Sequence, residues 1–175
     1  MAGEKKKIWD IEVPLLRKDF AALAISKEQL EGKFLKLDLS RIIKGKNMDA
    51  SLKISLKDDK LLADFYSLLI IQSSIKRMIR KGTSWIEDSF ITNSKDNLKM
   101  QIKPFMITKK KVSRSLKNAL RKASRELLLD YVSKKNSQEM FSSIISGKLQ
   151  REMSSKLKKI YPLSNFEIRV CKIKS

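Results

Sequence analysis

Apolar and charged residues alternate in four stretches of the first two thirds of the chain, at 9–13, 35–39, 52–56 and 98–102. In each stretch the apolar residues occupy every second position, so a strand would carry them on one face and the charges on the other. This pattern is typical of an antiparallel sheet with one buried face. Turn-forming residues separate the stretches, at 31–32, 44–47, 58–59 and 94–97.

The segments between these strands have weaker patterns. Apolar residues at helical spacing over 73–81 predict a short helix that Gly82 ends, and 85–92 returns to strand character. The apolar run 65–71 fits either element, because a short continuous run has no decisive period. We expect Pro104 at an edge or a bulge, since proline donates no hydrogen bond to a sheet ladder.

From Ser113 onward the apolar residues recur every three or four positions, which predicts helices. Ser113 is a suitable N-cap for the first helix, and Asn136 with Glu139 three residues later predicts the start of a second. A third helix covers 148–160 and ends before Pro162. The apolar stripe of the first helix consists of Leu116, Leu120, Ala123, Leu127 and Tyr131.

Together these elements predict an α+β fold. A curved or barrel-like, mostly antiparallel sheet is followed by two or three helices and a C-terminal strand that returns to the sheet. At 175 residues and 42% hydrophobic composition, the chain suits one domain with a genuine core. We expect a single domain over 1–175, made of a basic tail (1–7), a strand-rich lobe (8–112), a helical segment (113–160) and the closing strand (161–175).

Positive charge is concentrated toward the C-terminus. The last 79 residues carry 20 Lys and Arg against 5 Asp and Glu, whereas the first 96 carry 19 against 14. A net charge of +20 points to a polyanionic partner, and RNA or DNA is the commonest one. Aromatic residues make up only 7% of the chain, so extensive base stacking on an aromatic platform is not expected.

The composition also removes much of enzyme chemistry. The chain has no histidine and a single cysteine, Cys171, which excludes a disulfide within the chain, paired-thiol metal sites and the usual Ser-His and Cys-His nucleophiles. We therefore expect a non-enzyme without cofactor or metal; a carboxylate- or lysine-based enzyme is the remaining alternative. The longest apolar run, 68–71, is far too short to span a membrane, and a cytoplasmic protein is the simplest interpretation.

The strongest candidate site is the basic segment that begins at Lys109 and continues along the helix after Ser113. At 100° per residue, its basic side chains lie beside the apolar stripe rather than within it, so one face can pack while its neighbour presents cations. A solvated charged face is the alternative. The candidate RNA-binding residues of this segment are Lys109, Lys110, Lys111, Arg114, Lys117, Arg121, Lys122 and Arg125. Weaker candidates are Lys5, Lys6, Lys7, Lys44, Lys46, Lys158 and Lys159.

Four motifs, in order along the chain, resemble one family. They are the opening strand 7–14, the Leu-Glu-Gly-Lys turn 30–33 with the strand after it, the segment 105–111 that ends in Thr-Lys-Lys-Lys, and Ile-Tyr-Pro-Leu at 160–163 followed by 166–172. These are similar to motifs of the archaeal and eukaryotic small-subunit ribosomal protein family S3Ae, also called S-one-e. The stretch 65–73 departs from the family by lacking polar residues found there.

The resemblance implies a structural protein on the platform side of the small ribosomal subunit, near the messenger exit. Its partners would be ribosomal RNA and neighbouring ribosomal proteins, with messenger RNA as a further candidate, and no membrane. Three alternatives share part of the pattern: a free-standing RNA chaperone or DNA-binding protein, a membrane-surface protein using its basic helix, and the enzyme already mentioned. The helix lacks the Trp or Phe expected on a membrane-inserting face.

Overall fold

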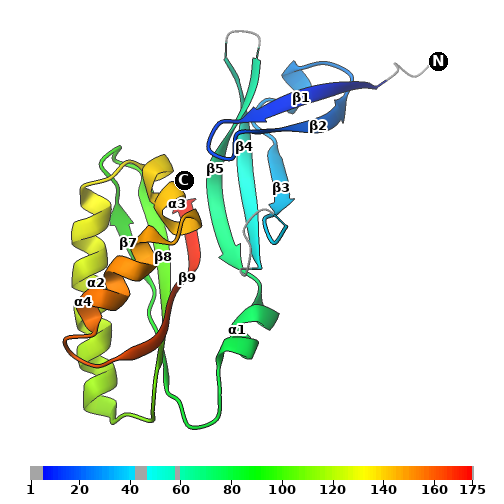
Figure 1. The fold of residues 1–175 in the computed structure, drawn as a ribbon. Helices are drawn as coiled ribbons and strands as arrows, with labels where there is room; N and C mark the ends of the chain where they lie inside the picture. The colour runs from blue at the N-terminus through cyan, green and yellow to red at the C-terminus, as the bar shows by residue number, and fades with distance from the viewer. Residues whose placement is uncertain (1–5, 42–46, 58–59, 175) are drawn as a thin grey trace.

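The computed structural model describes residues 6–41, 47–57 and 60–174, and the statements below concern these residues. They form nine strands, four α-helices and one short 3-10 helix (Figure 1). In chain order these are β1 (Lys7–Val13), β2 (Lys18–Ala24), η1 (Glu28–Leu30), β3 (Phe34–Asp38), β4 (Met48–Lys57), β5 (Lys60–Ile70), α1 (Gln72–Met78), β6 (Trp85–Glu87), β7 (Phe90–Asn93), β8 (Lys99–Thr108), α2 (Arg114–Ser133), α3 (Ser137–Ile145), α4 (Lys148–Leu157) and β9 (Leu163–Lys174).

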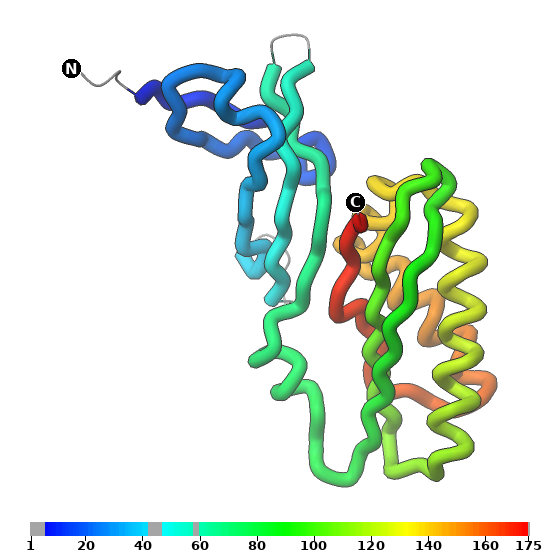
Figure 2. Tube along the Cα trace, turned by 180° about the vertical axis from the view of Figure 1, so that it is seen from behind, coloured from blue at the N-terminus to red at the C-terminus, as the bar shows by residue number. Residues whose placement is uncertain are grey.

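The strands form one open, mostly antiparallel sheet in the order β2-β1-β5-β9-β8-β6. β4 pairs with the other edge of β5 and carries β3, while β7 pairs with β8 beside β6. The closing strand β9 therefore lies between β5 and β8 and joins the two halves of the sheet (Figure 2). The α+β class and the return of the C-terminal strand to the sheet are confirmed.

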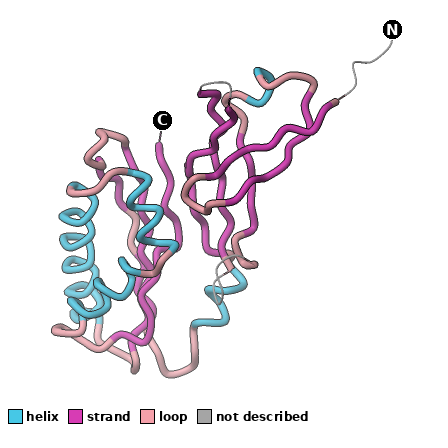
Figure 3. The backbone as a smooth tube through the Cα atoms, turned by 45° about the horizontal axis from the view of Figure 1, so that its top comes forward, coloured by secondary structure: helices cyan, strands magenta, loops and turns pink. Residues whose placement is uncertain are grey.

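The helices α2, α3 and α4 gather on one side of the β7-β8-β9 half (Figure 3). Met100 and Ile102 of β8 are buried, whereas Lys99 and Gln101, which alternate with them, are not. Along α2 the fully buried line is Leu120, Ser124, Leu128 and Val132, and the other residues of the predicted stripe are half-buried beside it. The buried line is therefore rotated from the predicted stripe toward Ser124.

Several element boundaries differ from the expectation. α1 ends at Met78 because Ile79 is already extended (φ −79°, ψ 122°), so Gly82 lies in the following loop rather than at the helix end. The undecided run 65–71 is the second half of β5 up to Ile70, and Ile71 is the N-cap of α1. The predicted strand 85–92 is broken into β6 and β7, and β2 was not predicted.

The caps and the bulge are confirmed. The Ser113 hydroxyl accepts the Leu116 N–H (3.4 Å), and Asn136 with Glu139 forms the capping box of α3. The register of β8 against β9 shifts between Lys103 and Pro104. At this point the neighbour of β8 on its other edge changes from β7 to β6. Proline, which has no N–H to donate, therefore lies between two short strand pairings rather than within one.

A side-chain amide bridges the two halves of the structure. β5 pairs with β1 only at residues 61–62 and with β9 only at 67–69, so the edge between these pairings has no strand beside it. Gln138 of α3 lies there: its Oε1 accepts the Phe65 N–H (3.3 Å) and its Nε2 donates to the Phe65 carbonyl (3.1 Å). The amide thus takes the place of a strand residue, while the Phe65 and Phe141 rings pack beneath it at 5.8 Å.

The single cysteine belongs to this core. Cys171 is fully buried in β9, and burial raises the pKa of its thiol to about 12. The thiol therefore stays protonated at neutral pH and Cys171 is a packing residue.

Candidate nucleic-acid interface

Three loops meet at one end of the helical half, the lower end in Figure 1: α1–β6 (79–84), β8–α2 (109–113) and α4–β9 (158–162). Backbone hydrogen bonds join them. The Thr108 N–H donates to the Ser84 carbonyl (2.9 Å), and the Lys109 N–H donates to the Pro162 carbonyl (3.4 Å). Segments far apart in the sequence are therefore held side by side at this end.

All three loops belong to stretches without acidic residues. No Asp or Glu occurs in 65–86, 97–125 or 153–166. The cations that these stretches bring together are all exposed, and we call this surface the basic end. It consists of Arg80, Lys81, Lys109, Lys110, Lys111, Arg114, Lys158 and Lys159.

A buried hydroxyl pair shapes the lysine loop. The Thr108 side chain is fully buried; it accepts the Ser84 N–H (3.1 Å) and lies 2.7 Å from the Lys110 carbonyl oxygen. The Ser84 hydroxyl in turn accepts the Val112 N–H (3.3 Å). These contacts satisfy the polar groups of the turn on its inner side, so the three lysine side chains point to solvent.

The predicted basic face of α2 continues from this end. Lys117, Arg121 and Lys122 follow Arg114 along the helix, and Arg121 also lines an open pocket of about 540 Å³ beside β6 and β7. In the described part of the chain, no salt bridge involves these side chains or those of the basic end. The charge of Arg121 helps to lower the pKa of Asp88, with which it shares this pocket; the other cations can meet phosphate oxygens.

Arg125 differs from the other cations of this face. Its Nη2 donates to Asp88 Oδ1 (2.6 Å) and its Nε donates to Asp88 Oδ2 (2.9 Å), while its guanidinium lies 5.6 Å from the centre of the Phe90 ring. Asp88 lies at the break between β6 and β7, so this bidentate pair ties α2 to the edge of the sheet. Arg125 is thus already engaged, and its predicted role in phosphate binding is shared with a structural one.

Burial acts to raise the pKa of Asp88, but hydrogen bonds from Arg125 and Ser89 outweigh it and hold the pKa below its ordinary value of 3.8. Because folding lowers this pKa, the pair stabilises the fold above pH 3.8, and the contribution is lost as pH falls through the lower folded value. We expect Asp88→Asn to lower the free energy of unfolding by about 1–2 kcal/mol at neutral pH. Urea denaturation at several pH values measures this effect.

The control is Asp130→Asn, which removes an ion pair to Lys134 in which both side chains are mostly exposed. This substitution should change the free energy of unfolding by less than about 0.5 kcal/mol. The role given to the ion pair would be contradicted if Asp88→Asn lowered the free energy of unfolding by the same amount in strong acid as at neutral pH.

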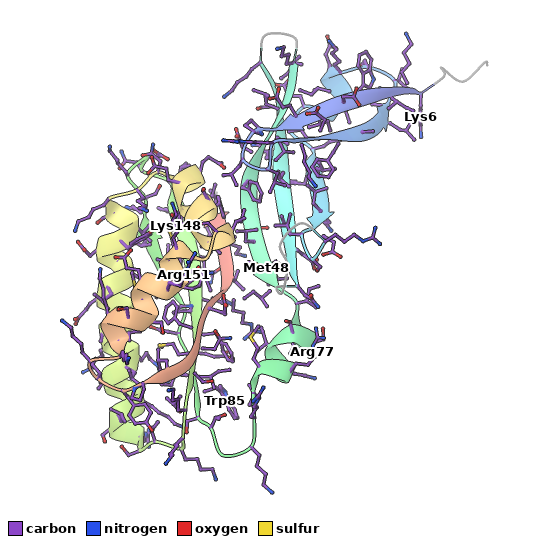
Figure 4. The ribbon with its side chains drawn as sticks, in the orientation of Figure 1. Lys6, Met48, Arg77, Trp85, Lys148 and Arg151 are labelled. Atoms are coloured by element: carbon purple, nitrogen blue, oxygen red, sulfur yellow. The ribbon has the colours of Figure 1, made fainter. Side chains whose placement is uncertain are left out.

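The other candidates lie elsewhere. Lys6 and Lys7 are at the start of β1, far from the helices (Figure 4), so the structure does not join them to the basic end. Lys5, Lys44 and Lys46 lie outside the described residues, as do the predicted turn at 58–59 and most of the one at 44–47. The RNA contacts proposed for these five lysines stay predictions.

The basic end also contains residues that the sequence did not single out. Arg80 and Lys81 lie in an acid-free stretch, a signal visible in the sequence, but only the fold brings their loop, through Ser84, beside Thr108. Trp85 is 53% exposed at the start of β6, next to this loop. Trp9 is half-buried, and its indole N–H donates to the Ala24 carbonyl (3.3 Å).

In the described residues, no group of three or more His, Cys, Asp and Glu side chains is arranged to hold a metal ion. None of the helices described is both long and apolar enough to cross a membrane.

Comparison with known proteins identifies the family of this sequence. The sequence model of the Ribosomal S3Ae family matches residues 4–175, nearly the whole chain. The chain belongs to the Ribosomal S3Ae family. The resemblance drawn from the four motifs is thereby confirmed.

Relatives with the name small ribosomal subunit protein eS1 include those of Methanothermobacter thermautotrophicus and Nanoarchaeum equitans. The first is 34% identical over 94 residues, which cover 54% of this chain and 48% of the relative. The second is 25% identical over 176 residues, which cover 96% of this chain and 89% of the relative. The relative from Methanobrevibacter smithii is 31% identical over 99 residues, covering 57% and 51%. Two of these matches thus span about half of the relatives' length.

Proposed function

We propose that this protein is a structural constituent of the small ribosomal subunit, acting in translation, and that it binds ribosomal RNA through the basic end and the adjoining face of α2. The observation that carries the RNA contact is the meeting of three acid-free stretches at one exposed end, without an acidic partner in the described residues. Family membership and the names of the relatives support the ribosomal assignment.

Contacts of this kind hold the protein in position more than they select a sequence, because lysine and arginine side chains on a surface bind phosphates. The rest of the fold would then be presented to neighbouring ribosomal proteins. The family resemblance supports a location on the platform near the messenger exit, and messenger RNA is a further candidate partner there. No catalytic role and no cofactor form part of this proposal.

The test is sedimentation of native cell extract on sucrose gradients at low and high magnesium, with this protein followed by mass spectrometry. We expect stoichiometric migration with the small subunit that persists through a moderate salt wash. Migration only at the top of the gradient would contradict the ribosomal assignment and favour a free-standing RNA-binding protein or RNA chaperone, which shares the charge but needs no ribosomal neighbours.

A further inference from the structure

The sheet has a second face, opposite the helical layer, that the proposed function does not use. On β8 the buried Met100 and Ile102 face the helices, so strand alternation places Lys99, Gln101 and Lys103 on the other side. Lys103 is half-buried at the gap between β6 and β7, where it also lines the edge pocket that Arg121 reaches. Figure 1 shows α4 crossing in front of β7 and β8, and the same strands face the viewer in Figure 2. No helix covers this side of β7 and β8 in these views.

The strand register places further lysines on the same side. Lys99 is directly opposite Lys174 of β9, Gln101 is opposite Lys172, and Lys103 is opposite Val170. Residues directly opposite one another in an antiparallel pair share a face of the sheet. On the other side of β8, Ile91 of β7 lies opposite Gln101 and is exposed. We call the surface formed by Lys99, Lys103, Lys172 and Lys174 the open sheet face.

This face is cationic, and its lysines form no ion pairs within the described residues. No Asp or Glu occurs among the residues of β7, β8 and β9 that share it. Glu87 and Asp88 line a pocket together with Lys103, but these carboxylates are paired with Arg169 (3.0 Å) and Arg125 (2.6 Å). Lys99 and Lys174 are like charges directly opposite one another, an arrangement that destabilises a sheet. A bound polyanion would relieve this repulsion.

The side chains of the open sheet face indicate which class of polyanion it would bind. Its β7–β9 residues include no aromatic side chain on which a splayed base could stack. Its cations are lysines, which act as point charges toward phosphates. Lys99 and Lys103 are four residues apart on β8, so the lysines of this face extend over about 13 Å along the strand. We propose that the open sheet face is a second RNA-binding surface, which holds the sugar-phosphate backbone of helical RNA.

This inference rests on the proposed RNA-binding function and extends it. The basic end lies beyond Thr108, at the opposite end of β8 from Lys99, and these two residues are about 30 Å apart along an extended strand. With cations at both places, the protein would bridge two RNA segments, or two stretches of one, rather than dock against a single site.

The test combines substitution with lysine footprinting. The fourfold Lys→Gln variant at 99, 103, 172 and 174 is titrated with a mixed-sequence RNA duplex over a range of salt concentrations. Each lost phosphate contact lowers the slope of log affinity against log salt by about 0.9, so we expect a decrease of roughly 3–4. The matched control variant carries Gln at Lys18, Lys33, Lys53 and Lys57, four exposed lysines of the other half with the same total charge. An equal decrease in the control variant would overturn the proposal.

Acetylation of lysines in the full chain, free and RNA-bound, separates the two surfaces. Protection of Lys99, Lys103, Lys172 and Lys174 together with the lysines of the basic end supports both proposals. Protection of the basic end alone overturns this inference and leaves the proposed function standing, and protection of neither overturns both. Protection of the open sheet face by polyglutamate or by poly-uridine, but not by the duplex, would overturn it in favour of an acidic protein segment or single-stranded RNA.

Discussion

Replacing Lys110, Lys111, Arg114 and Lys159 by glutamine should lower the affinity for ribosomal RNA by a factor on the order of 10²–10³ at about 0.15 M salt. Lys110, Lys111 and Lys159 come from two of the three loops of the basic end and Arg114 is the first residue of α2; all four are exposed. Each phosphate contact contributes about 0.9 to the slope of log affinity against log salt, so the slope should decrease by about 3–4. Fluorescence anisotropy with small-subunit RNA over a salt series measures both quantities.

The substitutions should leave the fold intact, because none of the four side chains makes a salt bridge in the described residues. Unchanged circular dichroism and an unchanged urea midpoint would establish this. The control variant at Lys18, Lys33, Lys53 and Lys57 removes the same charge from the other half of the molecule. If it weakens RNA binding as much, the contribution of the basic end is net charge alone and the proposed interface is wrong.

The candidate site shows what local sequence can and cannot predict. The basic face of α2 follows from helical periodicity, because residues three or four positions apart on a helix are neighbours whatever the rest of the chain does. The contribution of Arg80 and Lys81 depends on the contact between Ser84 and Thr108, 24 residues apart, which no local pattern encodes. The engagement of Arg125 depends in the same way on Asp88, 37 residues away.

The fold shows the same division. The alternating strands β1, β3, β4 and β8 were predicted because their apolar residues alternate with polar ones, and in β1, β4 and the first half of β8 the apolar face is buried. In β3 the alternating leucines are half-buried. β2 was missed because its sequence, KDFAALA, has small residues on both faces and obtains its strand conformation by pairing with β1. Likewise, the break between β6 and β7 coincides with the bulge at Pro104 on the neighbouring strand rather than with a turn signal of its own.

Replacing Gln138 by methionine should lower the free energy of unfolding by about 2–4 kcal/mol. Methionine is of similar size, so packing is kept, but the Phe65 N–H and carbonyl both lose their partner. Phe65 is 1% exposed, so water does not readily replace the amide, and a buried polar group without a partner costs about 1–3 kcal/mol. Urea denaturation followed by circular dichroism measures the loss.

Gln138→Glu is the informative companion, because a carboxylate can still accept the Phe65 N–H but, when ionised, no longer donates to the carbonyl. Its destabilisation should therefore decrease as pH falls and the carboxyl group gains a proton to donate, whereas that of Gln138→Met should not depend on pH in this way.

The same urea denaturation curves test the prediction of one domain over 1–175. Gln138 connects α3 to the middle of β5, so in a single cooperative unit its loss shifts one transition of the entire chain. Two separated transitions would show that the strand-rich and helical halves unfold independently, and a midpoint unchanged by Gln138→Met would mean that this amide contributes nothing to holding them together.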